Sequence, residues 1–191
     1  ALTNAFTILP RKVTFRSADA EKEYDALPLT TNEVTWTRQD EAGPGTGVLR
    51  AEEGFLSFDV TGSQTEVGSS PNDFEIVWGE GISPRNYDVT VEYGTLTVTA
   101  RDASGLWIAY PDPFYYGGTN ICPAVTVALT NGLGQVVSNL VEGVDFTVAY
   151  YDNVNAFDSP YLVVTPNGNF ADGALTNAFT ILPRKVTFRS A

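Results

Sequence analysis

The side chains able to perform chemistry in this chain are mainly carboxylates, and histidine is absent. The 191 residues contain 23 Asp and Glu, no His and one cysteine. Without His, the commonest general base and the Ser–His and Cys–His nucleophile pairs are missing. Carboxylate pairs such as Glu52 with Glu53, or Asp145 with Asp152, remain, but a surface this acidic brings carboxylates together without any catalytic role. The sequence therefore predicts that the chain is not an enzyme.

Hard oxygen ligands gather in one short segment, formed by Asp152, Asn153, Asn155 and Asp158. Carboxylate and amide oxygens are the ligands that calcium prefers, so calcium is the one cofactor that the sequence admits. The segment lacks the glycine and the closing glutamate of an EF-hand loop. Asn and Asp also form ordinary turns by bonding to the backbone. We therefore expect a plain turn here, with a calcium site as the alternative.

Covalent cross-links have few candidate residues. A single cysteine, Cys122, forms no disulfide within the chain, and we interpret it as a small buried hydrophobe ahead of an expected strand. An isopeptide bond would suit a load-bearing protein and needs a lysine beside Asn or Asp. Lys12 alternates with Val13 and Phe15, which predicts that it faces solvent, so Lys22 is the candidate. The loss of ammonia or water in the intact mass reports such a bond.

Aromatic side chains cluster around two prolines in the second half of the chain: Trp107, Tyr110, Phe114, Tyr115 and Tyr116. Exposed aromatics stack on sugar rings or anchor protein partners. The alternative is that they fill the core of a domain and its boundary. Both interpretations stay open on the sequence alone.

The elements that must position these residues are β-strands. Apolar residues recur at every second position in five runs, which is the pattern of strands with one buried face. The runs are Leu56–Val60, Phe74–Trp78, Tyr87–Tyr93, Val125–Leu129 and Val144–Tyr150. The 28 Gly and Pro residues fall between the runs, as in hairpins and Greek-key turns, and no segment carries a helical stripe. The predicted fold class is all-β.

The chain contains an internal repeat. Residues Ala1 to Ala18 recur letter for letter as Ala174 to Ala191, a period of 173 residues. That period is too long for one solenoid unit and suits one large or two ordinary domains. We expect two domains per period and further near-identical copies in series in the parent protein.

The alternation of apolar residues locates the domain boundaries. Phe6 and Ile8 share one parity, and Val13 and Phe15 share the other, so the chain leaves one core at Pro10 and enters another. By identity the same junction lies at residue 183. The expected organisation is a last strand of a preceding repeat at 1–10, module A at 11–99, module B at 100–183, and the first strand of the next repeat at 184–191. Exposed edge strands seek partners, so both terminal segments are predicted to pair with neighbouring molecules.

Net charge limits the partners. One period, without the second copy of the repeat, carries eight Lys and Arg against 23 acids, a net charge of −15. Binding to phosphate backbones needs clustered basic residues, so we expect no nucleic-acid partner. The acidic surface also repels anionic lipid, and no run approaches 18 apolar residues, so no membrane insertion is expected.

Sequence motifs in both modules resemble those of a known family. Module A contains KEYDALPLT, FDVTGSQTEVGSS and NYDVTVEYGTLTVT, and module B contains CPAVTV, LVEGVDFTVAYYDNVNA and GNFADGALTNAFTI. These are similar to the YDG-type repeats that are grouped with the MBG domains of bacterial surface adhesins. The chain departs from the family pattern at Ala26, Phe146, Asp152 and Phe170.

The resemblance implies a fold and a place in the cell. It implies small Ig-like β-sandwich modules in an elongated tandem, which form the stalk of an extracellular adhesin attached to the cell wall of a Gram-positive-type bacterium. The family brings no catalytic residues. In this interpretation the partners of a module are adjacent repeats. The alternative is a repeated glycan- or protein-binding module that gains avidity through the aromatics of module B.

Overall fold

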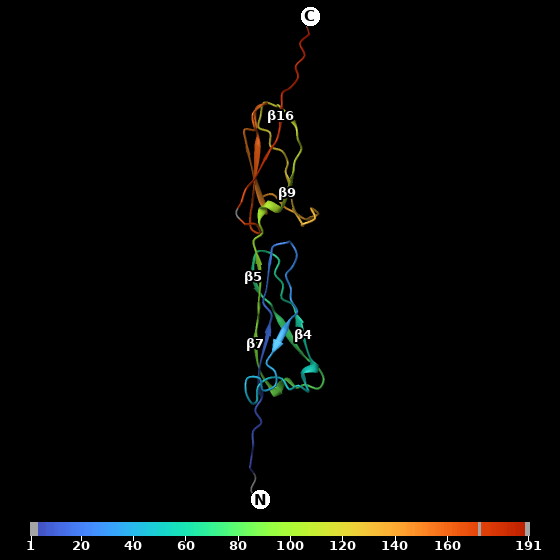
Figure 1. Cartoon of the computed structure of the whole chain (residues 1–191), viewed down its shortest axis with the longest axis vertical. Coiled ribbons are helices and arrows are strands. Elements are labelled where there is room, and N and C mark those ends of the chain that lie inside the picture. The colour runs from blue at the N-terminus through green and yellow to red at the C-terminus, as the bar shows by residue number, and fades with distance from the viewer. Residues whose placement is uncertain (1–3, 172, 190–191) are drawn as a thin grey trace. The chain divides into compact units, whose positions relative to one another are not determined.

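The computed structural model describes residues 4–171 and 173–189 of the chain, and within them every long element is a strand (Figure 1). The three helices that these residues form are single 3-10 turns. The prediction of an all-β chain is confirmed. By their contacts the residues divide into unit 1, Ala1–Lys22 with Pro28–Val98, and unit 2, Glu23–Leu27 with Thr99–Ala191.

The described residues of unit 1 form eight strands in three small sheets, with the orders β3-β1-β7, β2-β8-β5 and β4-β6. The elements are β1 (Arg11–Ser17), β2 (Ala20–Glu23), β3 (Val34–Trp36), η1 (Glu53–Phe55), β4 (Leu56–Val60), β5 (Gly68–Pro71), β6 (Phe74–Trp78), η2 (Pro84–Asn86), β7 (Tyr87–Glu92) and β8 (Thr95–Thr99). Alternate residues of β1, β3, β4 and β6 form one core. Its buried members are Val13, Phe15, Val48, Phe74, Ile82 and Tyr87.

Unit 2 is built in the same way, with the sheet orders β12-β11-β9, β13-β14-β15 and β10-β16. Its elements are η3 (Ala103–Gly105), β9 (Leu106–Ala109), β10 (Phe114–Tyr115), β11 (Thr126–Thr130), β12 (Val136–Asn139), β13 (Phe146–Tyr151), β14 (Tyr161–Pro166), β15 (Leu175–Ala178) and β16 (Ile181–Leu182). The buried members of its core are Val127, Phe146, Leu162, Val164, Phe179 and Ile181.

Two of the expected apolar runs are less buried than their alternation predicts. Val89 and Val91 are exposed because β7 is an edge strand of its sheet. Val144 is exposed because it lies in the turn before β13, where its N–H bonds to the carbonyl of Val141 at 3.2 Å. The other runs point into their cores as predicted.

A cluster of buried polar groups joins the two places in unit 1 where the chain passes from one sheet to another, after β1 and after β7. The Ser17 hydroxyl accepts the N–H of Gly94 at 2.9 Å and donates to the carbonyl of Asn72 at 2.6 Å. The Asn72 amide donates to the carbonyls of Ala18 and Thr31 at 3.1 and 3.2 Å. The chain passes here from β7 in one sheet to β8 in another.

Gly94 leaves no room for a side chain at this crossing. A Cβ at this position would lie 2.3 Å from the carbonyl oxygen of Ala18, which is backbone and is held by Asn72. We expect Gly94→Ala to lower the free energy of unfolding of unit 1 by about 1–3 kcal/mol or more, as overpacking does. Gly54→Ala is the matched control, because a Cβ at Gly54 meets nothing within 4 Å. Urea titrations of both variants make the comparison, and equal midpoints would contradict the packing argument.

Candidate functional site

The first copy of the repeated segment is folded only in its second half. Val13 and Phe15 on β1 are 2% and 0% exposed in the core of unit 1. Phe6 and Ile8 are 86% and 84% exposed, and residues 4–10 form no strand.

The second copy is folded only in its first half. Phe179 and Ile181, the counterparts of Phe6 and Ile8, are 5% and 3% exposed in the core of unit 2. Val186 and Phe188, the counterparts of Val13 and Phe15, are 70% and 92% exposed. The same letters are therefore buried or exposed according to which unit is beside them, and each half of the segment belongs to a different unit.

A single proline separates the two halves. Strand β16 ends at Leu182, whose carbonyl accepts the N–H of Tyr116 at 2.8 Å, and β1 begins at Arg11, the counterpart of Arg184. Only Pro183, or Pro10 in the first copy, lies between them. Proline fixes its own φ and restricts the residue before it to extended conformations. A chain that continues from unit 2 into a following unit 1 has one stiff connecting residue.

The side chain of Arg11 is held by a glycine-rich loop at the start of unit 1. Its Nε donates to the carbonyl of Gly47 at 2.9 Å, and its Nη2 bonds to the Asp40 carboxylate at 2.6 Å and to the carbonyl of Thr46. We name these four residues the Arg11 clasp. Only glycine fits at position 47, because its φ is +71° and a Cβ would lie 1.8 Å from the carbonyl oxygen of Arg38.

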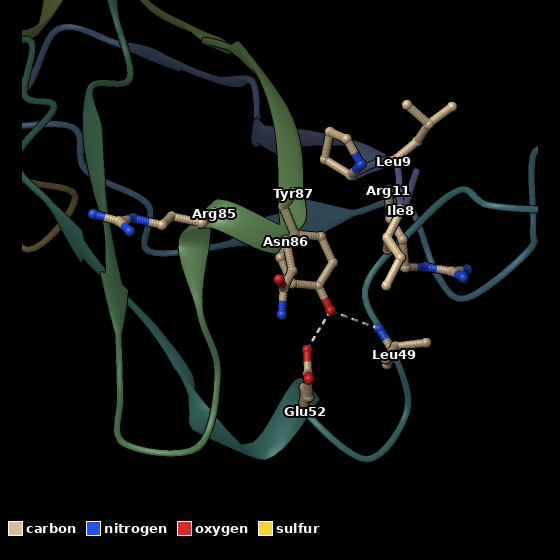
Figure 2. Close-up of a pocket in the computed structure, with 9 residues that line it drawn as sticks. Ile8, Leu9, Arg11, Leu49, Glu52, Arg85, Asn86 and Tyr87 are labelled. Carbon is tan, nitrogen blue, oxygen red and sulfur yellow. Dashed lines mark hydrogen bonds between the residues drawn. The ribbon is translucent and has the colours of Figure 1, made fainter. Parts of the chain in front are cut away.

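Next to Arg11 lies a cavity of about 410 Å³ at the N-terminal end of unit 1 (Figure 2). Tyr87 is one of its lining residues, and the Tyr87 hydroxyl donates to the Glu52 carboxylate and accepts the N–H of Leu49 at 3.2 Å. Burial and, after it, the hydrogen bond to Glu52 raise the pKa of Tyr87, which keeps the phenol neutral. The lining residues are Ile8, Leu9, Pro10, Arg11, Leu49, Glu52, Arg85, Asn86 and Tyr87.

The second copy of the junction makes a different contact. Arg184, the counterpart of Arg11, donates from its Nε to the carbonyl of Tyr116 at 2.7 Å. A groove beside it is lined by Tyr116, Asn155, Ala156, Pro183, Arg184 and Val186. The junction arginine thus binds either unit through the same nitrogen.

The four residues of the calcium alternative lie on one turn after β13. Asn153 is buried, and its amide donates to the carbonyl of Ile121 at 3.0 Å. This side chain therefore connects the turn after β13 to the loop before β11. Asp152, Asn155 and Asp158 are exposed. Among the residues that the structure describes, three or more His, Cys, Asp or Glu side chains nowhere gather as metal ligands. The calcium site stays an untested prediction.

The candidates for covalent chemistry lie in separate places. Lys22 is half-buried on β2. Cys122 is exposed, so its interpretation as a buried hydrophobe is wrong; its Sγ lies 3.6 Å from the Asn153 amide nitrogen. The strand expected after it begins only at Thr126, which leaves Cys122 in a loop.

The five clustered aromatics divide between core and surface. Phe114 packs edge to face on Phe179, and Tyr110 packs on the same core while its hydroxyl donates to the carbonyl of Ala178 at 2.6 Å. Trp107, Tyr115 and Tyr116 are exposed. Two of the five residues therefore fit the interpretation as core, and three remain available for binding.

Comparison with known proteins gives no relative: no family model, no curated protein and no solved structure matches the chain. Within the described ranges, none of the helices has the length and apolar character needed to span a membrane.

Sequence reasoning missed the Arg11 clasp and the Glu52–Tyr87 pair. Asp40 lies 29 residues from Arg11, and Glu52 lies 35 residues from Tyr87. The available signal was the run of glycines at 43, 45 and 47, all with positive φ, which marks a loop shaped to approach another backbone closely.

The duplicated phenylalanines provide matched controls inside one chain. We expect Phe15→Ala and Phe179→Ala each to lower the free energy of unfolding of their unit by about 3–5 kcal/mol, as truncation of a buried ring does. The chemically identical changes Phe188→Ala and Phe6→Ala are expected to leave both units unchanged, because these rings are exposed. Urea unfolding of the four variants tests this; equal losses at Phe15 and Phe188 would refute the assignment of the two halves.

The Arg11 clasp predicts an acid-sensitive contribution to unit 1. The Arg11 guanidinium and, after it, the N–H of Gly45 lower the pKa of Asp40. A carboxyl with a lowered pKa in the folded state stabilises the fold above its unfolded pKa of about 3.9, and this contribution is lost as the pH falls through the lower value. Asp40→Asn should therefore reduce stability at pH 7 and make no difference at about pH 2. Unfolding midpoints of both proteins between these pH values measure it, and parallel curves would contradict it.

Proposed function

We propose that the chain is one period of the stalk of a bacterial cell-surface adhesin. Each period consists of two small Ig-like β-sandwich modules, and successive periods project a distal binding region from the cell wall into the extracellular space. The partners of each module are its neighbours in the same chain.

The observation that carries this proposal is the complementary burial of the repeated segment. One copy supplies Phe15 to the core of unit 1, and the other supplies Phe179 to the core of unit 2. A segment whose halves fit two different cores is a connection between domains, and its exact duplication supports a series of identical connections. A tandem array is the arrangement that satisfies both halves of every copy.

The connection also suits a spacer. With one proline between β16 and the counterpart of β1, the modules have little slack chain about which to bend. Strand β1 has seven residues and spans about 23 Å at about 3.3 Å per residue. With loops at both ends a module is roughly 35 Å long, so a period of two adds roughly 70 Å. The net charge of −15 per period favours solubility and separation of neighbouring stalks.

A second candidate function is repeated binding of a host glycan or protein. The exposed rings of Trp107 and Tyr115 favour it, since such rings stack on sugars. Copies in series would then raise avidity. A glycan array probed with the one-period chain separates the two functions: a spacer gives no saturable signal, whereas a binding module gives a signal that Trp107→Ala abolishes.

The stalk proposal predicts growth of length with copy number. Chains of one, two and four periods should lengthen by roughly 70 Å for each added period, because rigid modules joined by short links add end to end. Small-angle scattering gives the maximum dimension of each chain, and electron microscopy shows its outline. Particles that stay compact as periods are added would rule out a stalk.

A further inference from the structure

We infer that the cavity at the N-terminal end of unit 1 is a socket for the end of unit 2 of the preceding repeat. The inference rests on the proposed tandem arrangement and names the surfaces that meet in it. The socket comprises Leu49, Glu52, Arg85, Asn86 and Tyr87. The occupant is a second copy of unit 2, presented by the residues around its last strand.

The first argument is the length of chain between the two anchored backbones. Unit 2 holds Leu182 through the N–H of Tyr116, and unit 1 holds Lys12, whose N–H donates to Gly45 at 3.2 Å and whose carbonyl accepts from Gly47 at 2.7 Å. Leu182 and the counterpart of Lys12 are three residues apart, which spans at most about 11 Å. In a continuous array, Tyr116 of one repeat therefore lies close to the Gly45–Gly47 loop of the next.

The second argument comes from the residues that border the cavity. Ile8 and Leu9 line it in the first copy (Figure 2), whereas Ile181, the counterpart of Ile8, is buried in the core of unit 2. A continuous chain keeps Ile181 in its core and still carries Pro183 and Arg184 to the cavity's edge. The end of unit 2 that holds Ile181 then faces the socket.

Unit 2 carries an apolar surface at that end. Tyr116 and Ala156 line the groove beside Pro183 and Arg184, and Phe157 follows directly. Phe157 is 84% exposed with φ +71°, an unfavourable backbone conformation for a bulky residue that also leaves its ring in solvent. The adjacent acid, Asp158, is complementary in charge to Arg85 of the socket.

In a continuous array the arginine after the proline could bond through its Nε to only one of the two units. Its Nε carries one proton, yet that nitrogen donates to Gly47 in one copy and to Tyr116 in the other. The contact with unit 1 includes the charged bond to Asp40, and bonds between charged partners are the stronger ones. In the array we therefore expect this arginine to form the Arg11 clasp of the following unit. The carbonyl of Tyr116 then has no bond to the arginine and lies at the interface.

A two-period chain tests the socket, because identical sites occur in it once at the internal junction and once at a free end. With Cys122→Ser in both periods, single cysteines replace exposed Thr147 in the first period and exposed Glu75 in the second, and both carry spin labels. Pulsed electron paramagnetic resonance then gives the distribution of distances across the junction. A socketed junction gives a single narrow distribution.

The variant Phe157→Asp supplies the decisive comparison. Placed in the first period, at the junction, it should broaden the distribution at least about twofold, because a short link alone limits the motion of two domains less than a packed apolar interface does. Placed in the second period, at the free end, the same change should leave the width unchanged. Arg85→Glu gives the mirror pattern, with an effect in the second period and none in the first.

Three results would overturn the inference: a broad distribution in the parent chain, equal effects of Phe157→Asp in both periods, or no effect in either. The last is also the result expected if the cavity serves a small molecule instead of a neighbouring module. Small-angle scattering on the same samples keeps the two proposals apart. If the chain lengthens by a full period but the distance distribution across the junction is broad, the socket is refuted and the stalk proposal stands. If the chain does not lengthen, the stalk proposal itself is refuted.

Discussion

The core of unit 1 depends on strand β1, and β1 is supplied by the residues directly after the junction proline. This strand lies in the middle of its sheet, between antiparallel β3 and parallel β7, so both of its edges are used. Its inward residues Val13 and Phe15 fill the core, and Ser17 at its end fixes the crossing into the second sheet. Unit 1 therefore takes the central strand of this sheet from the repeated segment, and a cut within Arg11–Ser17 would remove part of its core.

The eighteen repeated residues must therefore satisfy the packing of two different cores. The first nine must suit the core of unit 2, where Phe179 and Ile181 lie, and the last eight must suit unit 1. A substitution at a core position such as Phe15 or Phe179 therefore affects one unit, whereas the arginine after the proline contacts unit 1 in the first copy and unit 2 in the second. The proline at the centre belongs to neither core and sets the stiffness of the link.

Much of the fold could be predicted from the sequence, because alternation of apolar residues reports directly on burial in strands. It located strands that contribute to both cores. It overestimated the burial of Val89, because alternation does not reveal that a strand lies at a sheet edge. The Arg11–Asp40 and Tyr87–Glu52 contacts join distant positions, and local patterns carry no information about such pairs.

The parallel pairing of β1 with β7 determines how unit 1 responds to tension. Six residue pairs, from Arg11 with Tyr87 to Arg16 with Glu92, align along the strand. If the chain carries load as the proposed stalk requires, tension that enters at Pro10 pulls β1 along its own axis, so the hydrogen bonds of these pairs are sheared together and do not open one at a time. In the proposed stalk, the first strand of the module is therefore also the strand on which the load falls.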